Sequence, residues 1–250
     1  PPRSTLFPYT TLFRSRLALT ISYVGTRLAG WQIQARTDRP QPRTVQGELE
    51  RIAERIVGAP VRLHGAGRTD SGVHAEAQVA HMDVPDHKAD MDWQRAFNAG
   101  LPDDISVSAV VRVPDDFHAR FDARGKLYAY TLWTAPGYVL PWRRGYVWDV
   151  GSRGALDAAA MAAAAREFTG RHDFAASRNV GSSVVTTVRE VWSVSRHPGI
   201  CPQEQVWRFH GAGFLKQMVR NMISALVAVG SGRLAPSDIA RLLAAADRTQ

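Results

Sequence analysis

Residues 61–84, VRLHGAGRTDSGVHAEAQVAHMDV, contain two apolar stretches on either side of a loop that holds two glycines. The stretches 61–66 and 78–84 are short and apolar, and each predicts a β-strand. The loop 67–74 reads Gly-Arg-Thr-Asp-Ser-Gly-Val-His. Its glycines permit positive φ and allow another molecule to approach the backbone closely. The stretch therefore predicts two strands joined by a loop that is suited to ligand contact.

The loop carries a single carboxylate, Asp70, two residues after Arg68. A carboxylate beside a cation in such a loop indicates a group that is kept ionised for chemistry or for binding. The glycines do not follow the spacing of a dinucleotide fingerprint, and no Gly-Lys-Ser/Thr sequence makes a phosphate-binding loop. Asp70 is therefore the leading candidate for a functional residue.

Further elements extend the pattern on both sides of this stretch. Thr44 and Gly58 are suited to cap the two ends of the first helix. The expected elements are a strand at 17–23, a helix at 45–56, a helix at 93–99 and a strand at 105–111. The order β-α-β-β-α-β, complete by about residue 113, is that of a ferredoxin-like unit.

The rest of the chain continues to alternate strands and helices. After a linking run at 114–124, the pattern predicts strands at 126–133, 184–195 and 206–210 and helices at 156–168, at 214–229 and from Ser237 onward. This irregular order lacks the spacing of a parallel βαβ sheet, so we predict the α+β class. The expected halves are 17–113, which carries the Asp70 loop, and 114–250.

Residues 1–16 show no periodicity and no continuous apolar core like that of a signal peptide. We expect a non-native or disordered leader here, and a basic arm that contacts RNA is the functional alternative.

The charge balance favours a polyanionic partner. Lys and Arg number 31 against 23 Asp and Glu, which gives a formal net charge of +8. Such a field attracts nucleic acid first and acidic membranes second, although a basic surface without a specific partner has the same composition. Cys201 is the only cysteine, which excludes a disulfide framework and fits a cytoplasmic protein. No apolar run approaches the roughly 20 residues of a membrane span.

Histidines near Asp70 raise the alternative of a metal site. His64, His74 and His81 lie close to Asp70 and Asp83 in the sequence. None of them has His-Glu-x-x-His spacing, and alternating strand positions do not bring them together. Hydrogen-bonded histidines are the favoured interpretation, with His74 supporting the loop backbone.

Aromatic and basic residues form the third candidate set. Tyr128 and Tyr130 share one face of the predicted strand at 126–133, either as core residues or as a stacking surface for unpaired bases. Arg220 lies outside the apolar stripe of its helix and either faces solvent or pairs with a carboxylate. The cations that could hold phosphates are His118, Arg120, Arg143 and Arg144.

Several motifs along the chain resemble those of the tRNA pseudouridine synthase A family. The loop 67–74 is similar to the catalytic motif of that family. The other matching blocks are Tyr23-x-Gly25, Gly30-Trp31-Gln32, Thr44-Val45-Gln46, 78–81, 98–105, 115–121, Tyr128-x-Tyr130, 218–221 and 247–249. They occur in order over about residues 17–250.

The resemblance implies a pseudouridine synthase fold. In this fold two ferredoxin-like halves form a mixed, mainly antiparallel sheet, with helices packed on it and a cleft between the halves. It also implies a cytoplasmic homodimer that isomerises uridine to pseudouridine at positions 38–40 of the tRNA anticodon stem-loop, with no cofactor and no metal. Family members continue past 247–249 into a final strand, so we expect the C-terminal half to lack that strand.

The resemblance also assigns roles to residues. Asp70 is implied as the essential acid, Tyr128 as the residue that packs on the target base and assists proton removal from C5, and Arg220 as the partner of Asp70. Arg68 is implied to help displace the flipped base. A non-catalytic RNA-binding protein of the same fold, a pseudouridine synthase acting on another RNA, and a metalloenzyme built on the histidines remain as alternatives.

Overall fold

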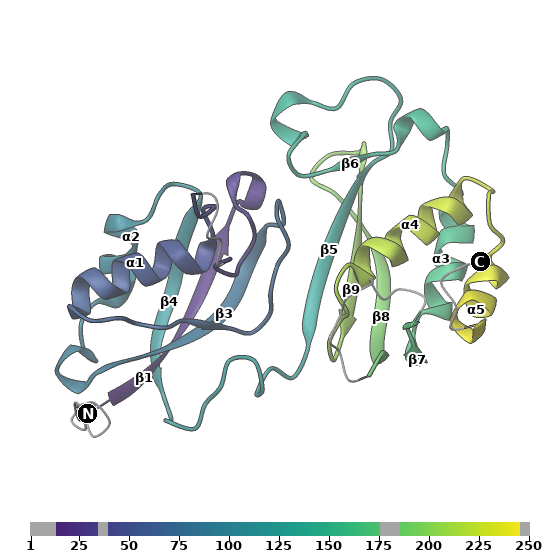
Figure 1. Cartoon of the computed structure of the whole chain (residues 1–250). Helices are drawn as coiled ribbons and strands as arrows, with labels where there is room; N and C mark the ends of the chain where they lie inside the picture. The colour runs from purple at the N-terminus through teal and green to yellow at the C-terminus, as the bar shows by residue number, and fades with distance from the viewer. Residues whose placement is uncertain (1–13, 35–39, 176–185, 246–250) are drawn as a thin grey trace. The chain divides into compact units, whose positions relative to one another are not determined.

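The computed structural model describes residues 14–34, 40–175 and 186–245 (Figure 1). Residue contacts divide the chain into a first unit, Pro1–Ala123, and a second unit, Arg124–Gln250. Each unit has its own sheet, its own helices and its own apolar core. The predicted motif at 247–249 and most of the predicted leader lie outside the described residues.

The first unit has the predicted β-α-β-β-α-β order. Its elements are β1 (Arg14–Tyr23), α1 (Val45–Val57), β2 (His64–Gly65), β3 (Ala75–Pro85), α2 (Trp93–Gly100) and β4 (Ile105–Val113). The four strands pair antiparallel in the order β2-β3-β1-β4. Apolar residues of both helices and of β1, β3 and β4 share one buried cluster. One face of the sheet is therefore covered by α1 and α2.

The ends of α1 follow the caps expected from the sequence. The Thr44 side chain accepts a hydrogen bond from the Gly47 N–H at 3.2 Å, which satisfies one of the free donors of the first turn. Gly58 closes the helix in the left-handed conformation with φ of 80°.

The predicted strand at 61–66 is shorter in the structure. His64 and Gly65 pair with β3 as strand β2, and the Ala66 N–H donates to the Val79 carbonyl of β3 at 2.7 Å. The backbone of Leu63 bonds to α1 side chains instead, because its N–H donates to Glu50 Oε1 at 2.9 Å and its carbonyl accepts from Gln46 Nε2 at 3.1 Å. Two helix side chains thus take the place of a strand partner.

Strand β1 begins at Arg14, so residues 14–16 belong to the sheet. Ser15 is buried, and its Oγ donates to Asp86 Oδ1 at 2.6 Å. Arg16 holds Asp83 with two hydrogen bonds of 2.7 and 3.1 Å and donates to the Phe117 carbonyl at 2.9 Å. These bonds attach the start of β1 to the end of β3 and to the segment that follows β4.

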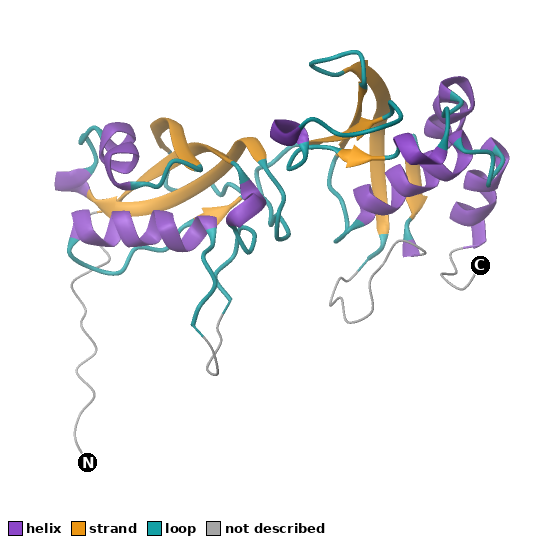
Figure 2. Cartoon of the chain, turned by 90° about the horizontal axis from the view of Figure 1, so that it is seen from above, coloured by secondary structure: helices purple, strands orange, loops and turns teal. Residues whose placement is uncertain are grey.

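The second unit is also α+β. Its elements are β5 (Lys126–Trp133), β6 (Trp148–Asp149), α3 (Ala158–Glu167), β7 (Gly170–Asp173), β8 (Val188–Pro198), β9 (Glu204–Gly211), α4 (Met218–Gly230) and α5 (Pro236–Ala245). The sheet order is β6-β5-β9-β8-β7, antiparallel except for the parallel pair of β5 and β6. Figure 2 shows the helices of this unit beside its strands, and they share one buried core with them.

The α+β prediction is therefore confirmed in both units. Strand β5 has the predicted bounds, whereas the short strands β6 and β7 were not predicted. Among the described residues, no helix combines the length and the apolar character needed to cross a membrane.

Candidate active site

Asp70 stands at the first position of a tight turn in the first unit. Its carbonyl accepts a hydrogen bond from the Val73 N–H at 3.2 Å, and Gly72 at the third position has φ of 80°. Positive φ at that position is what a type II turn requires, which explains the glycine. The Asp70 side chain is half-buried, and within the described ranges its carboxylate has no hydrogen-bond or ion-pair partner. The turn therefore presents the carboxylate for contact with another group.

The segment that follows β1 holds the turn through hydrogen bonds of Leu28 and Trp31. The Trp31 N–H donates to the Thr69 carbonyl at 3.1 Å, and the Leu28 carbonyl accepts from the Gly72 N–H at 3.3 Å and from Ser71 Oγ at 3.2 Å. On the other side of Thr69, its Oγ1 shares a hydrogen bond of 2.8 Å with the buried Tyr23 hydroxyl. Burial raises the pKa of Tyr23, so this hydroxyl stays protonated at neutral pH.

Two glycines let this segment approach the turn. Gly30 has φ of +94°, and a Cβ at this position would lie 2.4 Å from the Thr69 carbonyl oxygen. A Cβ at Gly25 would lie 1.9 Å from the Val73 carbonyl oxygen. Real side chains cannot occupy such distances, so the close contact of the two backbones requires glycine at both positions.

Gly30→Ala is expected to displace the Asp70 turn and lower turnover at least tenfold, with a loss of stability of about 1–2 kcal/mol. Gly58→Ala is the matched control, because Gly58 also has positive φ (+80°) but nothing lies within 4 Å of a Cβ there. Both variants should melt at lower temperature, and only Gly30→Ala should lose activity. Equal turnover in the two variants would show that the contact with Thr69 does not position Asp70.

The histidines near the turn have separate structural roles. His74 Nδ1 accepts a hydrogen bond from the Gly25 N–H at 3.3 Å, which is the backbone support expected from the sequence. His81 is buried, and its Nδ1 accepts from the Ala119 N–H at 3.2 Å. Its ring stacks on that of His64 with centroids 5.0 Å apart and meets the ring of His118 edge-on at 4.6 Å. Across the part of the chain that the structure describes, no group of three or more potential ligands is arranged to hold a metal.

Burial, with the neighbouring His64, lowers the pKa of His81 to about 4. In the unfolded chain this ring takes up a proton as the pH falls through about 6.5. In the folded chain it takes up the proton only when the pH falls to about 4. The folded protein should therefore keep its stability above about pH 6.5 and lose on the order of 2–3 kcal/mol as the pH falls from there to about 4.

His81→Asn should reduce this acid sensitivity, because the Asn Oδ1 can still accept from the Ala119 N–H but the amide does not titrate. Urea unfolding at a series of pH values tests this. The control is His87→Asn, which changes an exposed histidine and should leave the slope between pH 6.5 and 4 unaltered. If His81→Asn left the pH dependence of the unfolding free energy unaltered, the buried His81 ring would not be the cause of the acid sensitivity.

The segment after β4 presents two of the predicted RNA contacts. His118 Nδ1 accepts from the backbone N–H groups of Arg120 and Phe121 at 3.2 and 3.3 Å, and the backbone N–H of His118 donates to Asp122 Oδ2 at 2.6 Å. Arg120 is exposed, and its guanidinium carbon lies 6.0 Å from the centre of the Phe121 ring. The Phe121 side chain is itself 77% exposed and packs beside His118 at 4.2 Å. Phe121 was not singled out from the sequence.

Tyr128 and Arg220 belong to the second unit, whereas Asp70 and Arg68 belong to the first. Tyr128 is half-buried on β5, on the same face as Tyr130, and meets the Phe214 ring edge-on at 5.3 Å. Arg220 is exposed in the first turn of α4. Arg68 is exposed in the Asp70 loop.

Arg143 and Arg144 differ in their surroundings. Arg143 forms an ion pair with the buried Glu204 through Nε and Nη2, at 2.5 and 3.1 Å, and stacks near the Tyr146 ring at 5.2 Å. Arg144 is exposed, and its Nε donates to the Val139 carbonyl at 3.4 Å. The partner Glu204 lies 61 residues away in the sequence, and no local pattern indicates it.

Comparisons with known proteins agree on one family. Residues 19–122 and 164–250 match the model of a family described as tRNA pseudouridine synthase. A protein of Nitratidesulfovibrio vulgaris (strain DSM 19637 / Miyazaki F) named tRNA pseudouridine synthase A is 63% identical over 94% of this chain and 93% of its own length. Proteins of the same name from Solidesulfovibrio magneticus and Geobacillus kaustophilus are 61% and 40% identical, over 94% and 93% of this chain and 84% and 87% of their own lengths.

Proposed function

Because the chain belongs to the tRNA pseudouridine synthase family, we propose that it isomerises uridine to pseudouridine at positions 38–40 of the tRNA anticodon stem-loop. The observation that carries this proposal is the match over most of the chain, combined with a turn that presents the Asp70 carboxylate. The net charge of +8 fits a polyanionic substrate. A pseudouridine synthase acting on another RNA and a non-catalytic RNA-binding protein are the alternatives.

The reaction exchanges one bond of the uracil base for another. The bond between C1′ of the ribose and N1 breaks, the freed uracil turns, and a bond forms between C1′ and C5. C5 loses its proton and N1 gains one, so the product is an isomer of the substrate and no redox partner is needed. The target base must first leave the stack, at a cost of a few kcal/mol.

We assign the chemical roles to three residues. Asp70 acts on the ribose or the base so that the glycosidic bond breaks. Tyr128 packs on the base and assists removal of the proton from C5. Arg220 is assigned as the cationic partner of the Asp70 carboxylate during the reaction.

Arg220 lies in the first turn of α4. A cation in the first turn of a helix faces the positive end of the helix dipole, which is unfavourable by a few tenths to about 1 kcal/mol. An anionic partner removes that cost. The Gln217 residue that precedes α4 has φ of 62°, the one positive value among the described non-glycine residues, and this conformation sets the direction in which the helix begins.

The remaining predicted contacts are assigned to RNA binding. Arg68 stands on the Asp70 loop, where it can replace the flipped base in the stack. The half-buried His118 forms one group with the exposed Arg120 and Phe121, which offers a cation and aromatic rings to RNA. Arg144 is exposed and is assigned to RNA contact, and the ion pair of Arg143 leaves its Nη1 for a phosphate oxygen. We further propose that the protein acts in the cytoplasm as a homodimer. Light scattering of the purified protein would test the dimer.

Release of tritium from tRNA labelled at C5 of uridine tests the function. We expect release in the presence of EDTA, because no metal takes part in the assigned chemistry. A protein that binds tRNA but releases no tritium would support the non-catalytic alternative. Release from other structured RNAs but not from tRNA would support the second alternative.

A further inference from the structure

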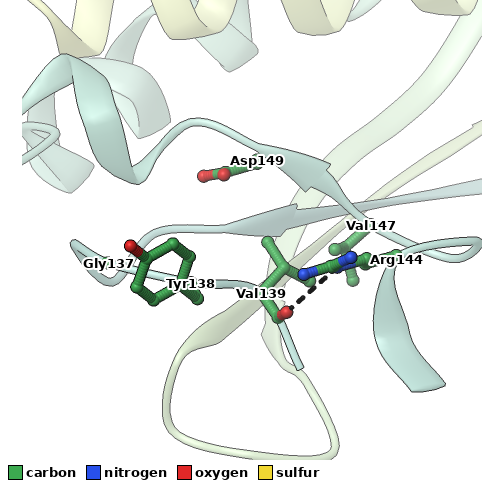
Figure 3. A pocket seen from close by; sticks show the side chains of 6 residues that line it. All are labelled: Gly137, Tyr138, Val139, Arg144, Val147 and Asp149. Carbon is green, nitrogen blue, oxygen red and sulfur yellow. Dashed lines mark hydrogen bonds between the residues drawn. The ribbon is translucent and has the colours of Figure 1, made fainter. Parts of the chain in front are cut away.

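A pocket of about 260 Å³ lies in the second unit, between β5 and β6 in the sequence. It is lined by Gly137, Tyr138, Val139, Arg144, Val147 and Asp149 (Figure 3). The family model matches residues up to 122 and from 164, so this segment falls outside the matched ranges. No role assigned above to Asp70, Tyr128 or Arg220 uses it.

The pocket combines one aromatic ring with two groups of opposite charge. Tyr138 is 91% exposed, so the face of its ring is open to a ligand. Figure 3 shows the Tyr138 ring, the Arg144 guanidinium and the Asp149 carboxylate around the same space. Arg144 uses Nε for the Val139 carbonyl, and Asp149 uses Oδ1 to accept from the Gly151 N–H at 3.0 Å. Within the described ranges the two side chains form no ion pair, so each keeps polar atoms for a ligand.

These groups match the edges of one nucleobase. Guanine offers N1–H and the N2 amino group side by side, and both donate to a carboxylate, whereas its O6 and N7 accept from a guanidinium. Adenine offers one donor, its N6 amino group, beside the N1 acceptor, and uracil offers one donor, N3–H, between two carbonyl oxygens. Neither base therefore presents two adjacent donors to a carboxylate. The exposed tyrosine ring provides a face on which a base can stack. The volume is below the roughly 300 Å³ of pockets for drug-sized ligands, and it suits a single base.

We propose that this pocket binds an unpaired guanine of the RNA substrate, at a site separate from Asp70. The inference rests on the proposed function for the choice of RNA as the ligand. The basic character of the chain favours RNA as the partner, and the Asp149 carboxylate favours a base over a phosphate in the pocket itself.

Binding of short labelled RNAs to the full chain tests the proposal. The probes are two hexaribonucleotides, UUUGUU and UUUAUU, followed by fluorescence anisotropy. Wild type should bind the guanine probe about fivefold more tightly, and Tyr138→Ala should weaken that binding roughly tenfold. Asp149→Asn should remove the preference, because the Asn Oδ1 can keep the bond from Gly151 but then turns an NH₂ group toward the base.

Trp142→Ala is the matched control, since Trp142 is 69% exposed on the same segment but does not line the pocket. It should change the binding of the guanine probe less than twofold. No preference for guanine in wild type, or equal losses in Tyr138→Ala and Trp142→Ala, would overturn the proposal.

Tritium release, measured on the same preparations, separates this inference from the proposed function. Tyr138→Ala should raise the KM for tRNA. A wild-type protein that forms no pseudouridine but prefers guanine through Tyr138 would overturn the proposed function and support the pocket. Full pseudouridine formation by a wild-type protein that shows no preference for guanine would support the proposed function and overturn the pocket proposal.

Discussion

Asp70→Asn is expected to abolish pseudouridine formation while leaving tRNA affinity within about tenfold of wild type. Phosphate contacts from arginine and lysine supply most of the affinity for RNA, whereas the carboxylate supplies the chemistry. The turn itself should persist, because Asp70 holds it through its backbone carbonyl and not through its side chain. Tritium release and filter binding of the same preparation measure the two quantities.

Asp90→Asn is the control for this variant, since it makes the same chemical change at an exposed position in the first unit. It should retain full turnover. Turnover of Asp70→Asn within tenfold of wild type would contradict the role of the carboxylate. A loss of affinity much greater than tenfold would show that Asp70 acts mainly in binding.

Tyr128→Phe is expected to lower turnover at least about a hundredfold, because general acid–base groups contribute roughly 10²–10⁴ to the rate. The phenyl ring can keep the edge-on contact with Phe214, so the melting temperature should change little. Single-turnover kinetics with saturating enzyme separate the chemical step from binding.

Tyr130→Phe makes the same change two residues further along the same strand face, where the ring meets Trp148 edge-on at 6.1 Å. Its turnover should stay within a factor of about three, since the Tyr130 hydroxyl forms no hydrogen bond within the described ranges and the ring contact with Trp148 is kept. Equal effects of the two substitutions would favour a purely structural role for Tyr128.

Local patterns predicted the elements whose residues bond mainly to close neighbours. The caps of α1 at Thr44 and Gly58 and the bounds of β5 are confirmed. The predicted strand at 61–66 was too long, because Gln46 and Glu50 bind the backbone of Leu63 from 13 to 17 residues away. Strands β6 and β7, with two and four residues, are too short to show a period.

In the candidate site, too, local features could be predicted and contacts between distant residues could not. Asp70 and its glycine-bounded loop stand out in the sequence because special backbone conformations require special residues. The hydrogen bond between Tyr23 and Thr69 joins residues 46 positions apart, and the ion pair of Arg143 with Glu204 joins residues 61 apart. Both depend on how distant strands and loops pack together, which a single sequence does not display.

Mapping of pseudouridine at single-nucleotide resolution tests the central claim most directly. An unmodified tRNA transcript with uridines at positions 38–40 and elsewhere would be incubated with the purified protein, digested and analysed by mass spectrometry. We predict pseudouridine at positions 38–40 of the anticodon stem-loop and at no other uridine of the transcript. A transcript that keeps all its uridines unmodified, or that gains pseudouridine only outside the anticodon stem-loop, would contradict the account.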